Sequence, residues 1–589
     1  MQKIQLSLPV GRLVGLTIFL LLAFNFCFLS TSFSQTYQWA HGFGGPNGNA
    51  QGNSIATDAQ GNVYVTGTFT DTIDYDPGIG TDTIYPNIFA ITTFIAKYDS
   101  SGGYVWTKKI EASPLADCYA EKIVVNNTGF YITGHFDLSV DFDLGSGTAI
   151  LNATGGASGD EDIFIAHYDL NGNYLWAKSM GGLNEDKALD MAVDNAGNSY
   201  ITGYFRDTVD LDPGMGVATF ISDGFQDSFF AKYDINGNYV WGYDLCDNSG
   251  TSALGRKVAF DFDSFQIYLI GEFNGTVDFD RGVGFNNISS QGGYDSYVLK
   301  IDTAGYFIWA GSIATPNSSG TAANIAIQDT NLYLCGIITD TTDFDIGLGV
   351  YNVAASGTNF ATDMFFAKYN LNGNVQWVRT LGNSASSQGL GNIKIDSLSN
   401  LFLTGTMTGS LDFDAGTGTS YQSSNGGADI AFAKYDNNGN FIWAKNIGGL
   451  YNDLPLSSDA DNNSQYITGY FTYAIDCDPD TGIALISPAN GQNILIGKYS
   501  EISTNIITIN NPNLQYLILY PNPASTFVTI GNKFENNNFE WEVLDMKGRV
   551  VIKKRSNDIS LNVAQLTLGI YLLELKNNNS IFRAKFIKK

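Results

Sequence analysis

The chain repeats itself seven times over most of its length, and this repetition restricts the folds that it can adopt. The phrase Asp-x-Asp, usually followed by x-Gly-x-Gly, begins at Asp74, Asp141, Asp210, Asp278, Asp343, Asp412 and, in a degenerate form, Asp476. A phrase of the type Phe-Ile-Ala-Lys-Tyr-Asp recurs in seven copies, and a tryptophan marker also recurs in seven copies. Units of about 66 residues therefore account for most of the sequence.

Each unit predicts four short β-strands. Apolar and polar residues alternate over short segments, β-branched and aromatic residues are frequent, and Gly or Asn separates the segments. The link between the third and fourth segments, such as Asp169-Leu-Asn-Gly-Asn173, is typical of a tight hairpin because Asn and Gly accept positive φ. Every unit is therefore expected to form a four-stranded antiparallel meander.

The two ends of the repeat array predict a ring. Trp39 has no Lys-Tyr-Asp segment before it, and the last such segment, residues 495–499, has no tryptophan strand after it. A first strand that pairs into the last unit explains this offset and leaves no exposed sheet edge, whereas an open solenoid would need polar caps. We predict an all-β fold with a seven-bladed β-propeller over residues 36–500, closed by the N-terminal strand.

The repeat phrases also carry a family resemblance. Gly-Asn-x-Tyr-x-Thr-Gly and Phe-Ile-Ala-Lys-Tyr-Asp, with the Asn-Gly turn and tryptophan that follow, resemble the β-propeller repeat family SBBP of exported bacterial proteins. The resemblance implies a propeller fold and a location outside the cytoplasm. It implies no common activity.

The first 35 residues are typical of a cleaved secretory signal peptide. Lys3 and Arg12 precede an apolar run over residues 13–29, which small polar residues follow. The alternative is a membrane anchor, but the run is shorter than the ~20 apolar residues that a membrane-spanning helix needs. We expect export, with no transmembrane segment after cleavage.

Residues 515–589 form a separate module in the sequence, after a linker over residues 501–514. Lys and Arg number 11 against 6 Asp and Glu after residue 511, whereas residues 36–511 hold 18 against 52. Six short strand patterns separated by turn residues predict a small β-sandwich.

Four phrases of this module resemble the type A C-terminal sorting domain of the type IX secretion system of Bacteroidetes-like bacteria. They are Tyr520-Pro-Asn-Pro523, Asp545-Met-Lys-Gly548, Gly569-Ile-Tyr-Leu-Leu573 and Lys585-Phe-Ile-Lys-Lys589. The resemblance implies that the type IX machinery is a partner, and that the protein crosses the outer membrane, loses this module, and is released or anchored at the cell surface. An ordinary adhesive β-sandwich is the alternative.

Composition excludes some partners. The formal net charge is −27 and only 15% of residues are charged, which argues against nucleic-acid binding and against docking on anionic membranes. Four cysteines follow the signal segment, and we interpret them as free or incidental: Cys118, Cys246, Cys335 and Cys477.

The Asp-x-Asp loops allow two interpretations. Paired carboxylates before a glycine turn are suited to calcium, but the same side chains also hold turns by accepting hydrogen bonds from backbone N–H groups. Repetition in every unit favours the structural role, and apart from calcium we predict no cofactor. All seven loops are expected at one rim, and the candidate calcium ligands are Asp74, Asp76, Asp141, Asp143, Asp210, Asp212, Asp278, Asp280, Asp343, Asp345, Asp412 and Asp414.

Catalytic chemistry has few candidates in the sequence. His41, His135 and His167 show no clustering with acid, Ser or Cys partners, so no catalytic residue is predicted. The Asp-x-x-Gly-x-x-x-Trp phrases are expected to hold neighbouring blades together. Acids outside the repeat pattern are interpreted as solvated loop charges, for instance Asp160, Glu161, Asp162, Glu185 and Asp186.

The function that these features favour is a secreted or surface-displayed, non-enzymatic propeller that binds a glycan or protein ligand on its loop rim. One alternative is a polysaccharide-active hydrolase or lyase with carboxylate catalysis in the central channel. Another is a purely structural component of the envelope. Two non-repeat acids at the channel mouth, with pKa values pushed apart, would favour the enzyme.

Overall fold

The computed structural model describes two compact units that are all β. The described residues are 32–589 except 47, 223–225, 246–250, 283, 316–320, 357–361, 383–387, 462–463, 481, 489, 505–518, 521–523, 531–538, 546–548, 557–559, 577–580 and 589. Phe33–Ser503 form one unit, and the described residues from Thr504 onward belong to the other. The secretory signal predicted over residues 1–35 lies almost entirely outside the described range. Among the described residues no helix has the length and apolar character needed to span a membrane.

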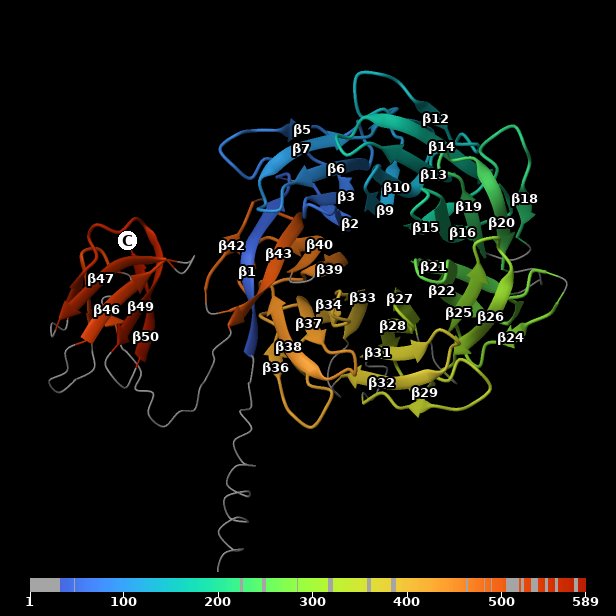
Figure 1. Ribbon diagram of the computed structural model, residues 1–589. Coiled ribbons are helices and arrows are strands. Elements are labelled where there is room, and N and C mark those ends of the chain that lie inside the picture. Colours follow the sequence, from blue (N-terminus) through green and yellow to red (C-terminus); the bar gives the residue numbers. More distant parts are fainter. Residues whose placement is uncertain are drawn as a thin grey trace, which may run out of the picture. The chain divides into compact units, whose positions relative to one another are not determined.

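The larger unit consists of antiparallel meanders arranged around a common centre (Figure 1). The innermost strands are β2 (Ala50–Thr57), β9 (Cys118–Asn126), β15 (Lys187–Val193), β21 (Ser252–Asp261), β27 (Thr321–Gln328), β33 (Gly389–Ile395) and β39 (Leu454–Ala460). The second strands are β3 (Val63–Phe69), β10 (Gly129–Phe136), β16 (Ser199–Phe205), β22 (Gln266–Asn274), β28 (Asn331–Ile338), β34 (Leu401–Met407) and β40 (Ser464–Thr472).

Two further strands complete each meander on its outer side. The third strands are β6 (Thr92–Tyr98), β13 (Asp162–Tyr168), β19 (Asp227–Tyr233), β25 (Asp295–Asp302), β31 (Asp363–Asn370), β37 (Asp429–Tyr435) and β43 (Gln492–Thr504). The outermost strands are β7 (Tyr104–Lys109), β14 (Tyr174–Gly182), β20 (Tyr239–Asp244), β26 (Phe307–Ile313), β32 (Val375–Leu381), β38 (Phe441–Ile447) and β1 (Ser32–Phe43). The four-strand pattern predicted for each repeat is therefore observed.

The first strand of the larger unit lies in the same sheet as the last strands. The strand order there is β1-β43-β40-β39, so β1 takes the outermost place that the last repeat leaves empty. The hydroxyl of Thr36 donates to the carbonyl oxygen of Ser500 at 3.2 Å, and the rings of Tyr37 and Tyr499 meet edge to face. Each innermost strand contacts those of its two neighbours, and this series of contacts returns from β39 to β2.

The hydrophobic core lies between neighbouring sheets. The second and third strands are almost entirely buried because each has a sheet on either side, as the run of buried residues from Val63 to Phe69 shows. One cluster joins Tyr268 and Val298 of one sheet to Leu334 and Phe365 of the next. Each sheet therefore depends on its neighbours for burial, as expected for a repeat array.

The Asp-x-Asp loops form small hairpins at the outer edge of the sheets (Figure 1). They are β4 (Ile73–Asp74) with β5 (Thr83–Ile84), β11 (Ser139–Asp141) with β12 (Ile150–Asn152), β17 (Thr208–Asp210) with β18 (Thr219–Ile221), β23 (Thr276–Asp278) with β24 (Asn287–Ser289), β29 (Thr342–Asp343) with β30 (Asn352–Val353), β35 (Ser410–Asp412) with β36 (Tyr421–Ser423), and β41 (Ile475–Asp476) with β42 (Leu485–Ile486).

Several of these hairpins pair with the chain that leaves the preceding sheet. β17 pairs with the end of β14, and β11 pairs with β8 (Glu111–Ala112). Gly448 and Asp476 form a similar isolated bridge. The hairpins therefore lie beside the outermost strands rather than beside the innermost ones.

The second unit contains two sheets around a small core. One sheet has the order β44 (Leu519–Tyr520), β45 (Phe527–Ile530), β48 (Ser560–Asn562), and the other has the order β47 (Val550–Ser556), β46 (Phe539–Leu544), β49 (Gly569–Lys576), β50 (Ile581–Lys588). Trp541, Val543 and Leu573 are buried in its core. The sequence analysis missed β48, a strand of three residues that is too short to show an alternating pattern.

Candidate ligand-binding site

The repeat aspartates of the hairpins accept hydrogen bonds from their own backbone. Oδ1 of Asp412 accepts from the N–H groups of Asp414 at 3.0 Å and Ser420 at 2.7 Å, and Oδ1 of Asp414 accepts from Gly416 at 2.8 Å. The same arrangement recurs at the pairs that begin with Asp74, Asp141, Asp210, Asp278, Asp343 and Asp476. These bonds are those that the structural interpretation of the motif expects.

The remaining residues of the motif also have a structural explanation. Phe413, between the two aspartates, is buried, and its carbonyl oxygen accepts a hydrogen bond from the Tyr435 hydroxyl at 2.7 Å. A Cβ at Gly418 would lie 2.2 Å from Oδ2 of Asp414, so the second glycine is required for space. Among the described residues, no group of three or more His, Cys, Asp or Glu is placed to hold a metal ion. Calcium binding at these loops stays a prediction.

The repeat lysines connect neighbouring sheets. Nζ of Lys300 donates to the carbonyl oxygen of Leu371 in the next sheet at 2.9 Å and lies 4.9 Å from the ring centre of Tyr268. Lys97, Lys232, Lys368 and Lys498 make the same pair of contacts. These lysine ammonium groups therefore make contacts between neighbouring sheets.

The repeat tryptophans contact the hairpin turn of the next sheet, as their sequence context predicts. The indole N–H of Trp309 donates to the carbonyl oxygen of Leu371 at 3.2 Å, and Trp176 donates to Ile235 at 3.0 Å. Four of these turns have a glycine with positive φ beside the indole, such as Gly237, where a Cβ would lie 2.7 Å from Trp176. A larger residue would be strained there and would also collide with the ring.

The variable positions of the repeat lie on the innermost strands. Each of these strands has a register irregularity at the same place, where one residue bulges toward the centre. The bulged residues are Asn53, Glu121, Leu189, Arg256, Ala323, Gly391 and Leu456, and those that follow them are Ser54, Lys122, Asp190, Lys257, Asn324, Asn392 and Ser457. The bulge itself does not require a particular side chain at these positions.

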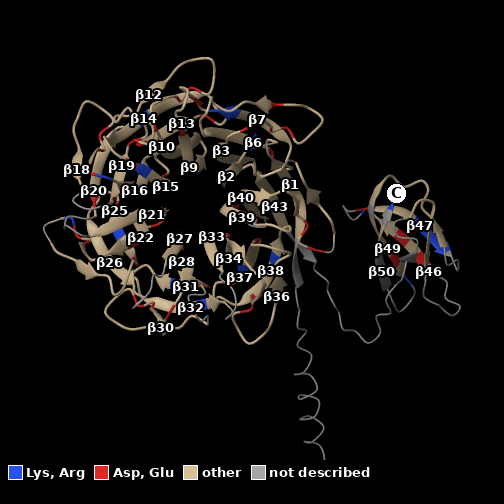
Figure 2. Cartoon of the chain, turned by 180° about the vertical axis from the view of Figure 1, so that it is seen from behind, with Lys and Arg blue, Asp and Glu red and all other residues tan. Residues whose placement is uncertain are grey.

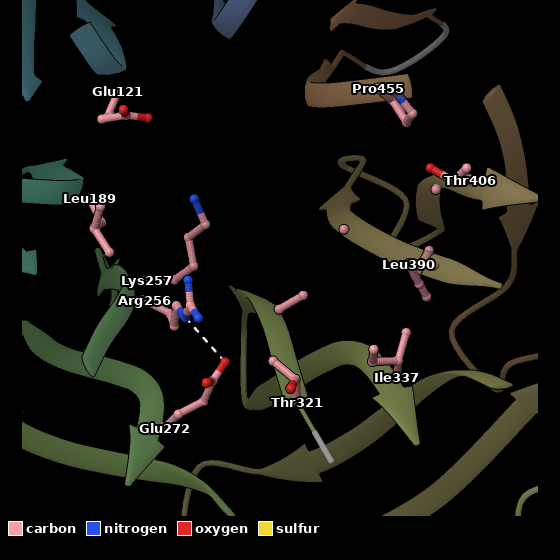
Figure 3. Close-up of a pocket in the computed structure, with 14 residues that line it drawn as sticks. Glu121, Leu189, Arg256, Lys257, Glu272, Thr321, Ile337, Leu390, Thr406 and Pro455 are labelled. Atoms are coloured by element: carbon pink, nitrogen blue, oxygen red, sulfur yellow. Dashed lines mark hydrogen bonds and ion pairs between the residues drawn. The ribbon is translucent and has the colours of Figure 1, made fainter. Parts of the chain in front are cut away.

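Six of these variable positions line a cavity of about 640 Å³: Glu121, Leu189, Arg256, Lys257, Ala323 and Gly391. Figure 3 shows Glu121, Leu189 and Lys257 on one side of the cavity, with Leu390 and Pro455 on the other. The space exists because Ala323 and Gly391 occupy bulge positions at which other repeats have larger side chains. A Cβ added at Gly391 would meet no atom within 4 Å. The sequence analysis did not find this cavity, although aligning the repeats by their bulges would have marked its residues as variable.

The cavity carries charged groups of both signs. The guanidinium of Arg256 contacts Glu272 at 3.1 Å, the dashed line in Figure 3. Burial raises the pKa of Glu121, even though the charge of Lys257 lowers it. Burial lowers the pKa of Lys257, and Asp190 at 3.7 Å opposes that shift. Figure 2 shows that Asp and Glu also occupy the peripheral hairpins, so acids are not confined to the cavity.

A second charged network lies between β10, β13 and β15. Nζ of Lys187 contacts Glu161 at 2.6 Å and Glu185 at 2.9 Å, and Nε2 of His135 lies 3.6 Å from Glu161. Burial lowers the pKa of His135 well below its usual value. The interpretation of non-repeat acids as solvated loop charges was wrong for Glu161, Asp162 and Asp186, which are 9%, 1% and 0% exposed. Ion pairing and backbone N–H donors allow their burial.

Two family models match parts of the chain. One is described as a beta-propeller repeat and matches residues 38–68. The other is described as a secretion system C-terminal sorting domain and matches residues 518–589. Both matches fall where the sequence phrases indicated these families.

Curated relatives match about half of the chain at low identity. An uncharacterized WD repeat-containing protein of Acanthamoeba polyphaga mimivirus is 26% identical over 55% of the chain. The regulatory protein FlaEY of Caulobacter vibrioides is 24% identical over 47% of the chain. The aligned region spans about a quarter of the length of each relative, 27% and 26%.

Solved structures give weak similarities. Sqt1 from Chaetomium thermophilum has a TM-score of 0.33 at 9% identity, covering 80% of this chain and 100% of that one. PorZ, a surface component of the type-IX secretion system of Porphyromonas gingivalis, has a TM-score of 0.19 at 10% identity, covering 93% and 100%. Neither value supports an argument about function. What the family matches show is that the chain contains a beta-propeller repeat of the SBBP family and ends in a secretion system C-terminal sorting domain.

Proposed function

We propose that the protein is a secreted or surface-displayed, non-enzymatic binding module built on a closed, seven-bladed β-propeller. The pairing of β1 with β43 supports closure, as does Lys498, whose Nζ reaches the carbonyl oxygen of Ser100 in the first repeat at 3.0 Å. The C-terminal sorting domain implies secretion or cell-surface export with removal of the tail. The type IX machinery would act on residues 515–589.

The cavity at the centre of the innermost strands is the observation that carries the binding proposal. Repeat aspartates, lysines and tryptophans contact the protein's own backbone, so they hold the fold. The bulge residues differ from repeat to repeat and face a space of about 640 Å³. A concave site with apolar walls and a few placed polar groups is the usual form of a ligand site.

The lining favours a ligand with both polar groups and apolar faces. Leu189, Ile337 and Leu390 offer apolar surface, while Arg256 and Lys257 offer cationic donors. A glycan chain or an extended segment of a protein ligand presents both kinds of surface. This site is nearer the molecular centre than the loop rim that the sequence favoured.

A binding screen with one narrowed-cavity variant tests the proposal. The full chain is applied to a glycan array and to a panel of extracellular proteins. Gly391→Leu introduces the side chain that Leu189 and Leu456 have at equivalent bulges, so it should fold, and it should weaken binding because the new side chain projects into the cavity and narrows it. Thr417→Leu is the matched control, since Ile79 and Leu348 occupy the equivalent exposed hairpin position.

The expected result is weakened ligand binding in Gly391→Leu and retention in Thr417→Leu, with cooperative melting of both. Equal binding by the two variants would show that the cavity is not the site. A screen without any ligand for the unmodified protein would remove the basis of the proposal.

A second candidate is a polysaccharide hydrolase or lyase, because two non-repeat acids line the cavity. Burial raises the pKa of Glu121, and Glu272 is ion-paired with Arg256. Glycoside hydrolysis commonly uses two carboxyl groups, one of them a general acid whose pKa is raised. Release of reducing ends from a polysaccharide, lost in Glu121→Gln while binding is kept, would establish this activity. Unchanged release in that variant would exclude Glu121 from it.

A further inference from the structure

One repeat lacks the tyrosine that the others place next to the hairpin. In six repeats the equivalent position pairs with the first residue of the outermost strand, just after a register irregularity at the repeat lysine or at His167, which takes its place in one repeat. Six repeats have a buried tyrosine there: Tyr98, Tyr168, Tyr233, Tyr369, Tyr435 and Tyr499. The remaining repeat has Ile301, which pairs with Phe307.

The tyrosine hydroxyl has a recurring partner in the hairpin. In five repeats it donates to the carbonyl oxygen of the residue between the two aspartates, at distances from 2.7 to 3.1 Å. Tyr435, for example, donates to Phe413. The equivalent carbonyl oxygen beside Ile301 is that of Phe279, and isoleucine has no hydroxyl to donate to it.

A cavity of about 280 Å³ occupies the place of the missing ring. Its lining includes Ile301 itself, Phe279, Phe230, Phe307 and Arg281. Protein interiors are close-packed, and substitution of a large residue by a smaller one leaves a cavity when the surroundings do not collapse. Isoleucine in place of tyrosine therefore accounts for the position of this cavity.

The aromatic walls of the cavity are those that hold the tyrosine ring elsewhere. Tyr435 lies against Phe366 with ring centres 4.5 Å apart, and Tyr499 lies against Phe432 at 4.8 Å. Phe230 is the equivalent of these phenylalanines, since each comes two residues before the repeat lysine of the preceding sheet. Phe307 matches Phe441, whose ring meets Tyr435 edge to face at 5.9 Å.

A second hydroxyl is also missing from this repeat. In the first repeat the Tyr104 hydroxyl donates to the carboxylate of Asp82. The equivalents are Phe307 and Asn286, and Oδ1 of Asn286 is buried without a hydrogen-bond partner among the described residues. The hairpin of this repeat thus has two acceptors that lack a hydroxyl donor: the carbonyl oxygen, which a tyrosine satisfies in five repeats, and the side chain of Asn286, whose equivalent is satisfied in the first repeat.

We propose that this cavity binds a phenolic ring, which lies between Phe230 and Phe307 and donates its hydroxyl to the carbonyl oxygen of Phe279. Leu245, Leu299 and Ile301 join the two phenylalanines in an apolar wall of the kind that accepts small aromatic molecules, and Asp280 and Arg281 form a polar edge. The cavity opens beside Tyr306, which is 72% exposed, so a ligand has a route from solvent. This site is separate from the central cavity and does not depend on the proposed function.

Binding of p-cresol, which reproduces the tyrosine side chain, tests the proposal directly. Ligand-observed NMR on the full chain should show binding with a dissociation constant of about 1 mM or tighter. Toluene has the same shape without the hydroxyl, so it should bind about fivefold more weakly. Equal affinity for the two compounds would overturn the assigned hydrogen bond, and absence of p-cresol binding would overturn the site.

Two variants at one position provide the matched controls. Ile301→Tyr restores the repeat residue and fills the cavity, so it should abolish p-cresol binding and raise the melting temperature of the protein. Ile301→Phe fills the same space without a hydroxyl, so it should also block binding but melt at a lower temperature than Ile301→Tyr. Binding of p-cresol by either variant, at the affinity of the unmodified protein, would show that the ligand lies elsewhere.

The same experiment distinguishes two sources of the phenol. N-acetyltyrosinamide presents the ring on a peptide backbone, whereas p-cresol is a free small molecule. Binding of both supports recognition of a tyrosyl side chain, and binding of p-cresol alone restricts the site to free phenols. Either result supports a phenolic ligand, and N-acetyltyrosinamide binding that persists in Ile301→Tyr contradicts it.

Discussion

At the scale of single residues, the repeat acids are explained by the backbone groups that they contact. Oδ1 of Asp412 accepts two N–H groups of its own hairpin, and the equivalent atoms in the other repeats do the same. The sequence allowed calcium as well, because a pair of carboxylates beside a glycine turn has the same residue types in both roles. The turn role and the calcium role differ in whether backbone N–H groups point at the carboxylate oxygens. The spacing of residues in the sequence does not reveal where those N–H groups point.

Substitution of Asp412 tests the turn role. Asp412→Ala removes the acceptor of two N–H groups and should lower the free energy of unfolding by about 1–3 kcal/mol. Asp412→Asn keeps one oxygen in place and should lower it less. Chemical denaturation of both variants measures the difference, and equal losses would contradict the role of the Oδ1 atom.

Calcium provides a second test of the same loops. A calcium ion takes six to eight oxygen ligands, whereas Oδ1 of each aspartate in the pair already faces N–H donors. We therefore expect the same melting temperature in millimolar calcium and in a chelator. A higher melting temperature in calcium, lost in Asp412→Asn, would establish the metal site instead.

Buried aspartates should make stability depend on pH. Burial raises the pKa of Asp186 to about 8, although N–H donors from Arg206 and Gly182 oppose the shift. Because the folded protein holds this proton more tightly than the unfolded chain, the contribution to stability is complete below about pH 4 and is lost as the pH rises through 8.

Thermal unfolding between pH 5 and pH 8 measures this effect. The melting temperature should fall across this range, and it should fall less in Asp186→Asn, which cannot ionise. Asp263→Asn changes an exposed aspartate and should keep the slope of the unmodified protein. An unchanged slope in Asp186→Asn would show that Asp186 is ionised throughout.

At the scale of secondary-structure elements, the meander in every repeat was predictable, whereas the bulge and the hairpin were not. Strand existence follows from local alternation and turn residues. The hairpin β17–β18 is only three residues per strand, and its place beside the outermost strand β14 depends on pairing with the preceding repeat. The central cavity was missed for a related reason, since Arg256 and Gly391 are unremarkable until the bulges bring them to the same level.

Packing between neighbouring sheets predicts the effect of losing a tryptophan ring. Trp443 is 5% exposed and contacts Phe402 and Phe432, so Trp443→Ala should lower the free energy of unfolding by about 3–5 kcal/mol. Trp176 lies at the equivalent position but is partly exposed. Trp176→Ala should therefore lower it less, as measured by chemical denaturation. A larger loss in Trp176→Ala would contradict the importance of burial.

At the scale of the whole molecule, the offset between the two ends of the array was the informative part of the sequence. It predicted that the first strand completes the last sheet, and β1 does lie beside β43. The ligand could not be predicted, because the fold needs no particular side chain at the bulges. The cavity beside Ile301 was also hidden, since a single substitution in one repeat becomes visible only when its neighbours are known.

Removal of the first strand tests the closure of the propeller. A variant without residues 33–43 would leave the edge of β43 unpaired, so it should melt at a lower temperature and associate through that edge. Size-exclusion chromatography and thermal unfolding measure both effects. A variant without residues 505–589 is the control, because the larger unit ends at Ser503 and should remain monomeric.

An unaltered melting temperature and a monomeric state in the variant without residues 33–43 would contradict closure by β1. The same outcome would require another segment to pair with β43.

The pairing of β1 with β43 also has a consequence for how fast the protein folds. Thr36 and Ser500 meet across 464 residues of chain. Contacts between distant residues form slowly, because the entropy of the intervening loop is lost before they add any stability. The inner repeats, joined by short turns, should therefore fold first, and the terminal strand should pair last. Until β1 pairs, the edge of β43 is exposed and can pair with another chain. The rate of this last pairing step therefore determines how long the chain is prone to aggregate.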